Sequence, residues 1–122
     1  MKIPYKLIFW ISLLGFSLAT LIPLGAGTFL EADAGIPLDK VIHTLGFGWL
    51  TYFATRAYAE RVSFIIVGLF VYGLLIEALQ EIGGHRTAEG ADVIANLVGI
   101  SLGFMVGTWI SKSSRSCRSD SR

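Results

Sequence analysis

The chain has 122 residues, of which 53% are hydrophobic and 16% are charged, and its formal net charge is +1. A soluble domain of this size carries about 25% charged residues, so the composition indicates a membrane protein rather than an ordinary soluble domain. The small net charge excludes a global basic field for binding nucleic acid. The single cysteine, Cys117, excludes an internal disulfide framework and a CxxC metal site.

Four hydrophobic stretches predict an all-α membrane protein with four transmembrane helices, since a spanning helix needs about 20 mostly apolar residues. In chain order they are residues 7–30, 38–58, 62–82 and 91–111. The first is interpreted as a retained span, because its apolar run is longer than the roughly 7–15 residues of a signal peptide. We expect residues 1–111 to form one four-helix domain and residues 112–122 a basic, disordered tail.

The positions of the basic residues predict the orientation. Eight of the ten Lys and Arg residues lie at the N-terminus, in the connection at residues 56–61 and in the tail. Such residues favour the cytoplasmic side of a membrane. We therefore expect a multi-pass protein of the cell membrane with both termini in the cytoplasm. The second and fourth stretches then begin, and the third ends, on the outward side.

Pairs of polar residues recur at this outward end of the predicted helices. Residues three or four positions apart share one helix face. The pairs with this spacing are Asp39 with His43, Glu77 with Gln80, and Asp92 with Asn96. A charge within a bilayer costs roughly 2.5–3.5 kcal/mol at a helix centre, so residues kept near it usually contact each other, an ion or a substrate.

A stripe of small residues continues the face of the fourth stretch. Gly99, Gly103 and Gly107 follow Asn96 at intervals that let another helix backbone approach closely. We expect the fourth helix to pack inward on this face. Gly68 and Gly73 of the third stretch are the candidates to receive it.

Three spaced patterns occur in order between about residues 38 and 107. Their residues are Asp39, Lys40 and His43, then Tyr72, Gly73, Glu77 and Gln80, and finally Arg86, Asp92, Asn96, Gly99 and Gly103. Together these patterns resemble the VanZ-like family of small bacterial membrane proteins. The resemblance implies an integral protein of the cell envelope with a link to glycopeptide (teicoplanin) resistance, and it implies no particular reaction.

One function that fits these residues is an outward-facing site for an anionic lipid-linked or cell-wall-related group. Side chains that exchange protons would be its catalytic candidates, namely Asp39, His43 and Glu77. Arg86 would hold the anion, because a guanidinium matches phosphate and carboxylate geometry. The other ligand-binding candidates are Gln80, Asp92 and Asn96. A metal site is a subsidiary interpretation, in which mixed oxygen and nitrogen ligands would come from Asp39, His43, Glu77 and Asp92. Zinc is not favoured because only one convincing histidine is available, and no metal or other cofactor is expected.

A second function that fits is a non-enzymatic four-helix membrane module whose polar residues hold the helices together. Catalysis and a purely structural role therefore both remain open. The expected partners are the lipid bilayer and an anionic ligand, without nucleic acid, and a homo-oligomer is compatible with either function.

Overall fold

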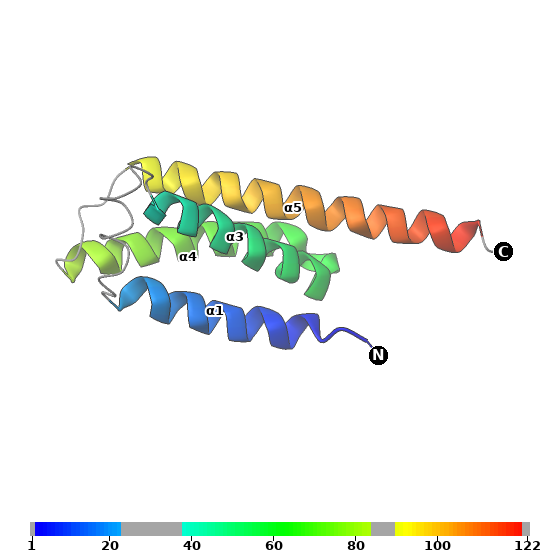
Figure 1. Cartoon of the computed structure of the whole chain (residues 1–122), viewed down its shortest axis with the longest axis horizontal. Helices are drawn as coiled ribbons and strands as arrows, with labels where there is room; N and C mark the ends of the chain where they lie inside the picture. The colour runs from blue at the N-terminus through cyan, green and yellow to red at the C-terminus, as the bar shows by residue number, and fades with distance from the viewer. Residues whose placement is uncertain (1, 23–37, 84–89, 121–122) are drawn as a thin grey trace.

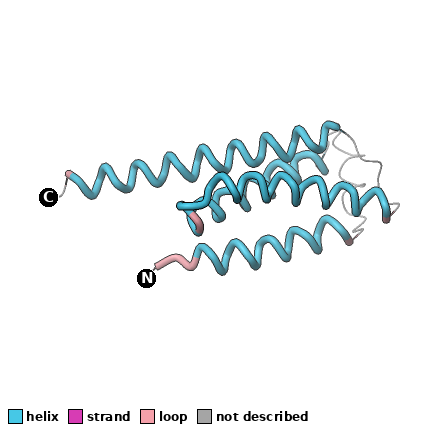
Figure 2. Tube along the Cα trace, turned by 180° about the vertical axis from the view of Figure 1, so that it is seen from behind, coloured by secondary structure: helices cyan, strands magenta, loops and turns pink. Residues whose placement is uncertain are grey.

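The protein is described here from a computed structural model, which describes residues 2–22, 38–83 and 90–120. Within these ranges the chain forms long helices and no strands, as Figure 2 shows. The helices are α1 (Tyr5–Leu21), α3 (Leu38–Ala57), the short 3-10 helix η1 (Ala59–Arg61), α4 (Val62–Ile82) and α5 (Gly90–Ser119). The long helices run alternately up and down, so both chain ends and η1 lie at one end of the bundle (Figure 1).

The predicted helix bounds agree closely with the structure in the middle of the chain. The second predicted stretch corresponds to α3 and the third coincides with α4, which ends where the Gly83 N–H reaches the Leu79 carbonyl at 3.0 Å. The first corresponds to α1 up to Leu21, and its predicted continuation to Leu30 lies outside the described residues.

The prediction of a disordered tail is wrong for residues 112–119. Helix α5 continues through them to Ser119 and projects past the other helices (Figure 1). The segment contains neither glycine nor proline, and its Lys and Arg residues are good helix formers. Exposure and basic charge therefore do not interrupt the helix that precedes them.

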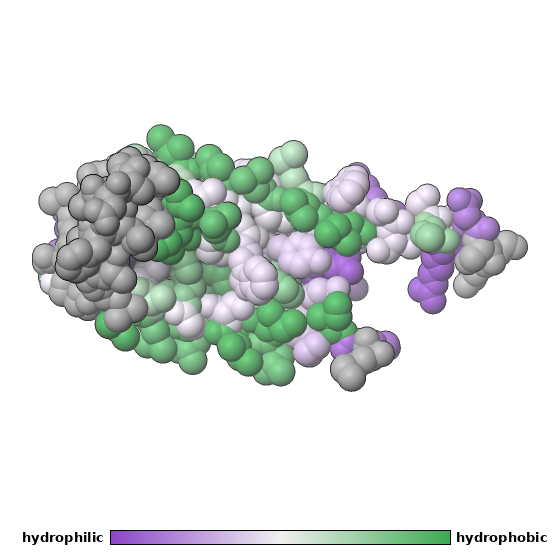
Figure 3. Space-filling model, in the orientation of Figure 1, coloured by the Kyte–Doolittle hydropathy of each residue, from purple (hydrophilic) through white to green (hydrophobic). Residues whose placement is uncertain are grey.

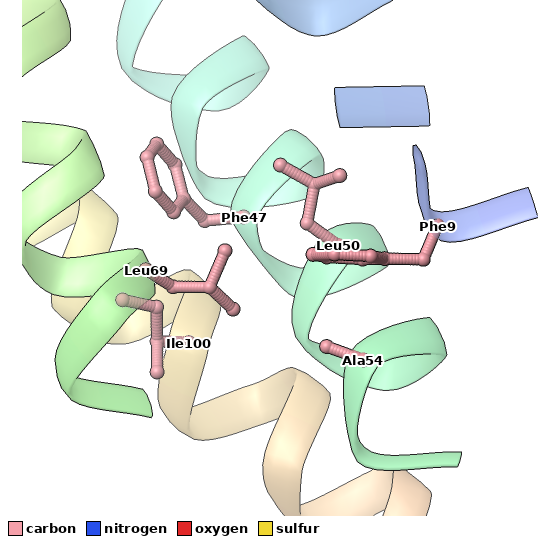
Figure 4. Packing of buried hydrophobic residues seen from close by; sticks show 6 residues of the cluster. All are labelled: Phe9, Phe47, Leu50, Ala54, Leu69 and Ile100. Atoms are coloured by element: carbon pink, nitrogen blue, oxygen red, sulfur yellow. The ribbon is translucent and has the colours of Figure 1, made fainter. Parts of the chain in front are cut away.

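The apolar core is centred on α3. Phe47, Leu50 and Ala54 of this helix are fully or almost fully buried. They meet buried side chains from the other three long helices, namely Phe9, Leu69 and Ile100 (Figure 4). Helix α3 thus faces neighbours on several sides.

The outer faces of the bundle are also apolar. Large hydrophobic side chains such as Leu14, Phe64 and Met105 are more than half exposed. Figure 3 shows this apolar surface along the sides of the bundle, with hydrophilic residues near the chain ends. An exposed apolar surface of this extent marks a contact with lipid or another protein.

Two of the described helices are long and apolar enough to cross a membrane, by length and composition: the η1–α4 segment Ala59–Ile82 and helix α5, Gly90–Ser119. Helix α1 is apolar but has 17 residues. Helix α3 carries His43, Thr51 and Thr55 on its buried face, and these polar side chains lower its mean hydropathy.

The glycine stripe of α5 packs inward, as predicted, but against a different helix. A Cβ atom on Gly99 would collide with the Thr44 carbonyl oxygen, and one on Gly103 with the Gly48 carbonyl oxygen. The receiving helix is therefore α3. Of the two glycines of α4 predicted to receive α5, Gly73 does lie against it, at Asn96, whereas Gly68 has open space around it and that part of the prediction is wrong.

Candidate functional site

The site lies at the end of the bundle opposite the chain termini. His43 is in the second turn of α3, Asn96 is in the second turn of α5, and Glu77 is near the end of α4. Helices α3 and α5 start at this end and run in the same direction, whereas α4 runs the opposite way and ends here (Figure 1), so the three side chains meet at one level. We call His43, Glu77 and Asn96 the polar cluster.

One amide side chain connects the three helices. Asn96 Nδ2 donates a hydrogen bond of 2.9 Å to Glu77 Oε1, and Asn96 Oδ1 lies 2.9 Å from His43 Nδ1. An amide oxygen only accepts, so His43 carries its proton on Nδ1 and donates it to Asn96. All three side chains are at most 6% exposed. These three side chains, which the sequence placed only at the same end of their helices, are therefore in direct contact.

Gly73 of α4 makes room for this amide. A Cβ atom at Gly73 would lie 2.8 Å from Asn96 Nδ2 and 3.0 Å from Phe47 Cζ. Any larger residue would push Asn96 away from Glu77. The sequence pattern contains Gly73, but nothing in its spacing reveals this role.

The imidazole of His43 sits between two aromatic rings. The Phe16 ring approaches it edge-on at a centroid distance of 6.0 Å, and the Phe47 ring stacks at 6.3 Å. Among the described residues, His43 Nε2 has no hydrogen-bond partner, although the side chain is 0% exposed. A buried polar atom without a partner costs about 1–3 kcal/mol. With Nδ1 protonated, Nε2 has a lone pair available for a proton or a donor group.

Asp92 lies beside a cation that the sequence analysis did not assign. Lys40 Nζ is 3.8 Å from Asp92 Oδ1; the lysine side chain is about one-third exposed and the carboxylate is buried. Asp92 is in the first turn of α5, where the helix dipole favours negative charge. Lys40 is three residues before His43 and so shares its helix face. This spacing is the sequence feature that could have identified Lys40 as a residue of the site.

Gln80 is buried but belongs to a separate contact. Its Nε2 donates a 2.8 Å hydrogen bond to the carbonyl oxygen of Thr20, in the last turn of α1. The last carbonyls of a helix have no partner within the helix, so this bond satisfies one of them. The structure thus connects Gln80 to α1 and not to the polar cluster.

Two predicted site residues have side chains outside the described residues. Asp39 opens α3, but its side chain lies outside the described residues, and so does all of Arg86. Their predicted roles stay predictions.

The donors of the site are an imidazole, a carboxamide and carboxylates. In the described part of the chain, no three His, Cys, Asp or Glu side chains come together as they would around a metal ion. The arrangement offers a lone pair on His43 Nε2, an imidazole held in one tautomer, and a cation at Lys40. These groups suit hydrogen bonding or proton exchange with a polar ligand.

The chain was compared with known proteins. The model of the VanZ/LLP1 family matches residues 4–111, which includes every residue of the site. Neither a curated protein nor a solved structure matches the chain significantly. The family match covers all four long helices up to the basic end of α5, and the chain therefore belongs to the VanZ/LLP1 family.

Proposed function

We propose that this chain is a multi-pass protein of the bacterial cell membrane, with four spanning helices and both termini in the cytoplasm. Support comes from the apolar outer faces of the helices and from the basic residues at the end that carries the termini. Basic residues favour the cytoplasmic side. The polar cluster then lies toward the outer side of the membrane.

Our proposed function is that this outward end binds an anionic lipid-linked or cell-wall-related group, with a link to glycopeptide resistance. The observation that carries it is the buried, unpartnered Nε2 of His43, within the described residues, beside a hydrogen-bonded chain that holds its ring. A ligand hydroxyl would donate to Nε2 and recover the cost of burying it. Lys40, and Arg86 as predicted from the sequence, would supply positive charge.

Asn96 and Glu77 orient His43 in this proposal. The amide fixes the Nδ1–H tautomer, and the Glu77 carboxylate in turn fixes the amide. A proton accepted at Nε2 would create an imidazolium, which a carboxylate two hydrogen bonds away stabilises electrostatically. Asp39 stays a predicted partner in proton exchange.

The variant His43→Asn tests this function. The Asn Nδ2 occupies nearly the position of His Nδ1 and keeps the donor to Asn96, while Nε2 is lost. We expect the protein level and the apparent melting temperature in detergent to be retained, and teicoplanin resistance of expressing cells to fall to the level without the gene. Full resistance with His43→Asn at normal expression would contradict a ligand at Nε2.

A second candidate is that the polar cluster only fixes the helices in one arrangement. The observation in its favour is that both polar atoms of the Asn96 side chain are hydrogen-bonded to residues within the bundle. Glu77→Gln distinguishes the two candidates, because Gln keeps an Oε1 acceptor for Asn96 but has no charge. A structural role predicts that Glu77→Gln preserves resistance and that Glu77→Leu lowers protein level. A stable Glu77→Gln protein without resistance would favour the binding function.

A further inference from the structure

A hydrophobic groove of about 400 Å³ runs between α1 and α4, away from the polar cluster. Its floor includes Phe9 and Leu69, which are buried. Its walls include Trp10 and Phe64, which are 57% and 82% exposed. The groove is therefore lined by core side chains below and is open to the surroundings above.

Gly68 keeps this groove open on the side of α4. A Cβ atom built on Gly68 finds no other atom within 4 Å. Glycine in a helix interior costs about 1 kcal/mol relative to alanine, so its presence here is not explained by helix stability. The absent side chain leaves room for something that is not part of the helix pair.

The groove ends among positive charges. Arg61 and Tyr58 line the groove and also line an adjoining polar hollow, together with Lys6, Arg56 and Glu60. Lys6 Nζ lies 5.3 Å from the centroid of the Tyr58 ring. Three cations and one carboxylate give this end a net charge of +2.

Two contacts hold this end in shape. Trp10 Nε1 donates a 3.0 Å hydrogen bond to the Tyr58 hydroxyl, which connects the groove wall to the polar end. Arg56 donates a 3.2 Å bond to the Tyr5 hydroxyl and lies over its ring. Lys6 and Arg56 are thus held against aromatic rings beside the groove.

We propose that this groove binds one anionic phospholipid of the cytoplasmic leaflet. An acyl chain would lie along Phe9, Leu69 and Gly68, and the phosphate would lie between Lys6 and Arg61. An apolar groove that ends in a net positive hollow matches a molecule with an apolar tail and a negative head. The inference rests on the membrane orientation proposed above and is independent of the function proposed for the polar cluster.

Trp10 provides the readout because it lies in the groove wall. In a Trp49→Phe, Trp109→Phe background of the full chain, Trp10 is the only tryptophan. The protein is placed in phosphatidylcholine vesicles that contain graded amounts of phosphatidylglycerol or phosphatidylcholine brominated at the 6,7 positions of an acyl chain. We expect brominated phosphatidylglycerol to quench Trp10 fluorescence at several-fold lower mole fraction than brominated phosphatidylcholine.

Two variants, each with a control, test the positive end of the groove and the space at Gly68. One basic residue near an anionic surface changes the affinity for an anionic lipid, relative to a neutral lipid, by about fivefold. The double variant Lys6→Gln, Arg61→Gln should therefore abolish the preference for phosphatidylglycerol over phosphatidylcholine. The control is the double variant Lys112→Gln, Arg115→Gln, which removes the same amount of positive charge outside the groove. This control should retain the preference for phosphatidylglycerol. Gly68→Leu should block the groove and weaken quenching by both lipids, whereas Gly15→Leu, also in open space, should not.

Equal quenching by the two brominated lipids would overturn the proposed lipid site while leaving the membrane orientation intact. If neither lipid quenches Trp10 fluorescence, both the lipid site and the proposed membrane orientation are overturned. A loss of preference with the Lys112 and Arg115 pair as large as with Lys6 and Arg61 would show a general surface charge effect, and that result too would overturn the proposal.

Discussion

Asn96 of α5 and Glu77 of α4 are joined by a 2.9 Å hydrogen bond inside the bundle, and the same amide bonds His43 of α3. A backbone amide could not make these contacts, because the helices use their own backbone groups internally. Side chains make the connection instead. The side chain of Asn96 therefore helps to set the relative positions of three helices.

Replacing Asn96 by Ala should lower the free energy of unfolding by about 1–3 kcal/mol, because it removes two interhelical bonds and each is worth about 0.6–1.7 kcal/mol in membrane proteins. Unfolding of the purified protein by SDS in mixed micelles measures this difference. Ser101→Ala is the matched control on α5, since the Ser101 hydroxyl is exposed and bonds only within its own helix. A double-mutant cycle of Asn96→Ala with Glu77→Leu should show coupling, and strictly additive losses would contradict the bond.

Gly103→Ala should destabilise the bundle by about 1–3 kcal/mol, because the added methyl group meets the backbone of α3 at Gly48, which moves only with the whole helix. The same SDS unfolding titration measures it. Gly15→Ala is the control, since open space surrounds Gly15 and alanine favours a helix by up to about 1 kcal/mol. Equal effects at the two glycines would contradict the close packing of α3 on α5.

Lys40→Gln should change stability by no more than about 1 kcal/mol, because the Lys40–Asp92 pair is long and its cation is partly exposed. If Lys40 contributes positive charge to the proposed ligand site, teicoplanin resistance should nevertheless fall. Lys112→Gln removes one positive charge at the opposite end of the bundle and should leave resistance unchanged. Resistance that survives Lys40→Gln at normal protein level would remove Lys40 from the ligand site.

The exposed Cys117 allows the orientation to be tested in the natural sequence. A membrane-impermeant maleimide should not label Cys117 in intact spheroplasts and should label it after permeabilisation, because the basic end of α5 is expected in the cytoplasm. In a Cys117→Ser background, Glu81→Cys places the thiol at the other end of the bundle, where labelling should occur without permeabilisation. Labelling of Cys117 in intact spheroplasts would reverse the proposed orientation.

The sequence by itself determined that the chain is helical and where α3 and α4 lie. The apolar run from Val62 to Ile82 lies between Arg61 and the pair Gly83–Gly84, and the structure has α4 at these residues. The spacing of Asp92 and Asn96 also identified the inward face of α5, and both residues are buried. These features are local, since charge, glycine and helical periodicity act within one helix.

Only the tertiary structure decided which residues meet. Helical spacing places Asn96 on a face but does not identify the helix opposite. The glycine stripe was therefore assigned to α4, whereas it packs on α3. Helical spacing also placed Gln80 on the same face as Glu77, although Gln80 donates its hydrogen bond to the Thr20 carbonyl of α1. Such pairings depend on how four helices fill space around one another, because close packing is a property of the whole bundle and not of any one helix.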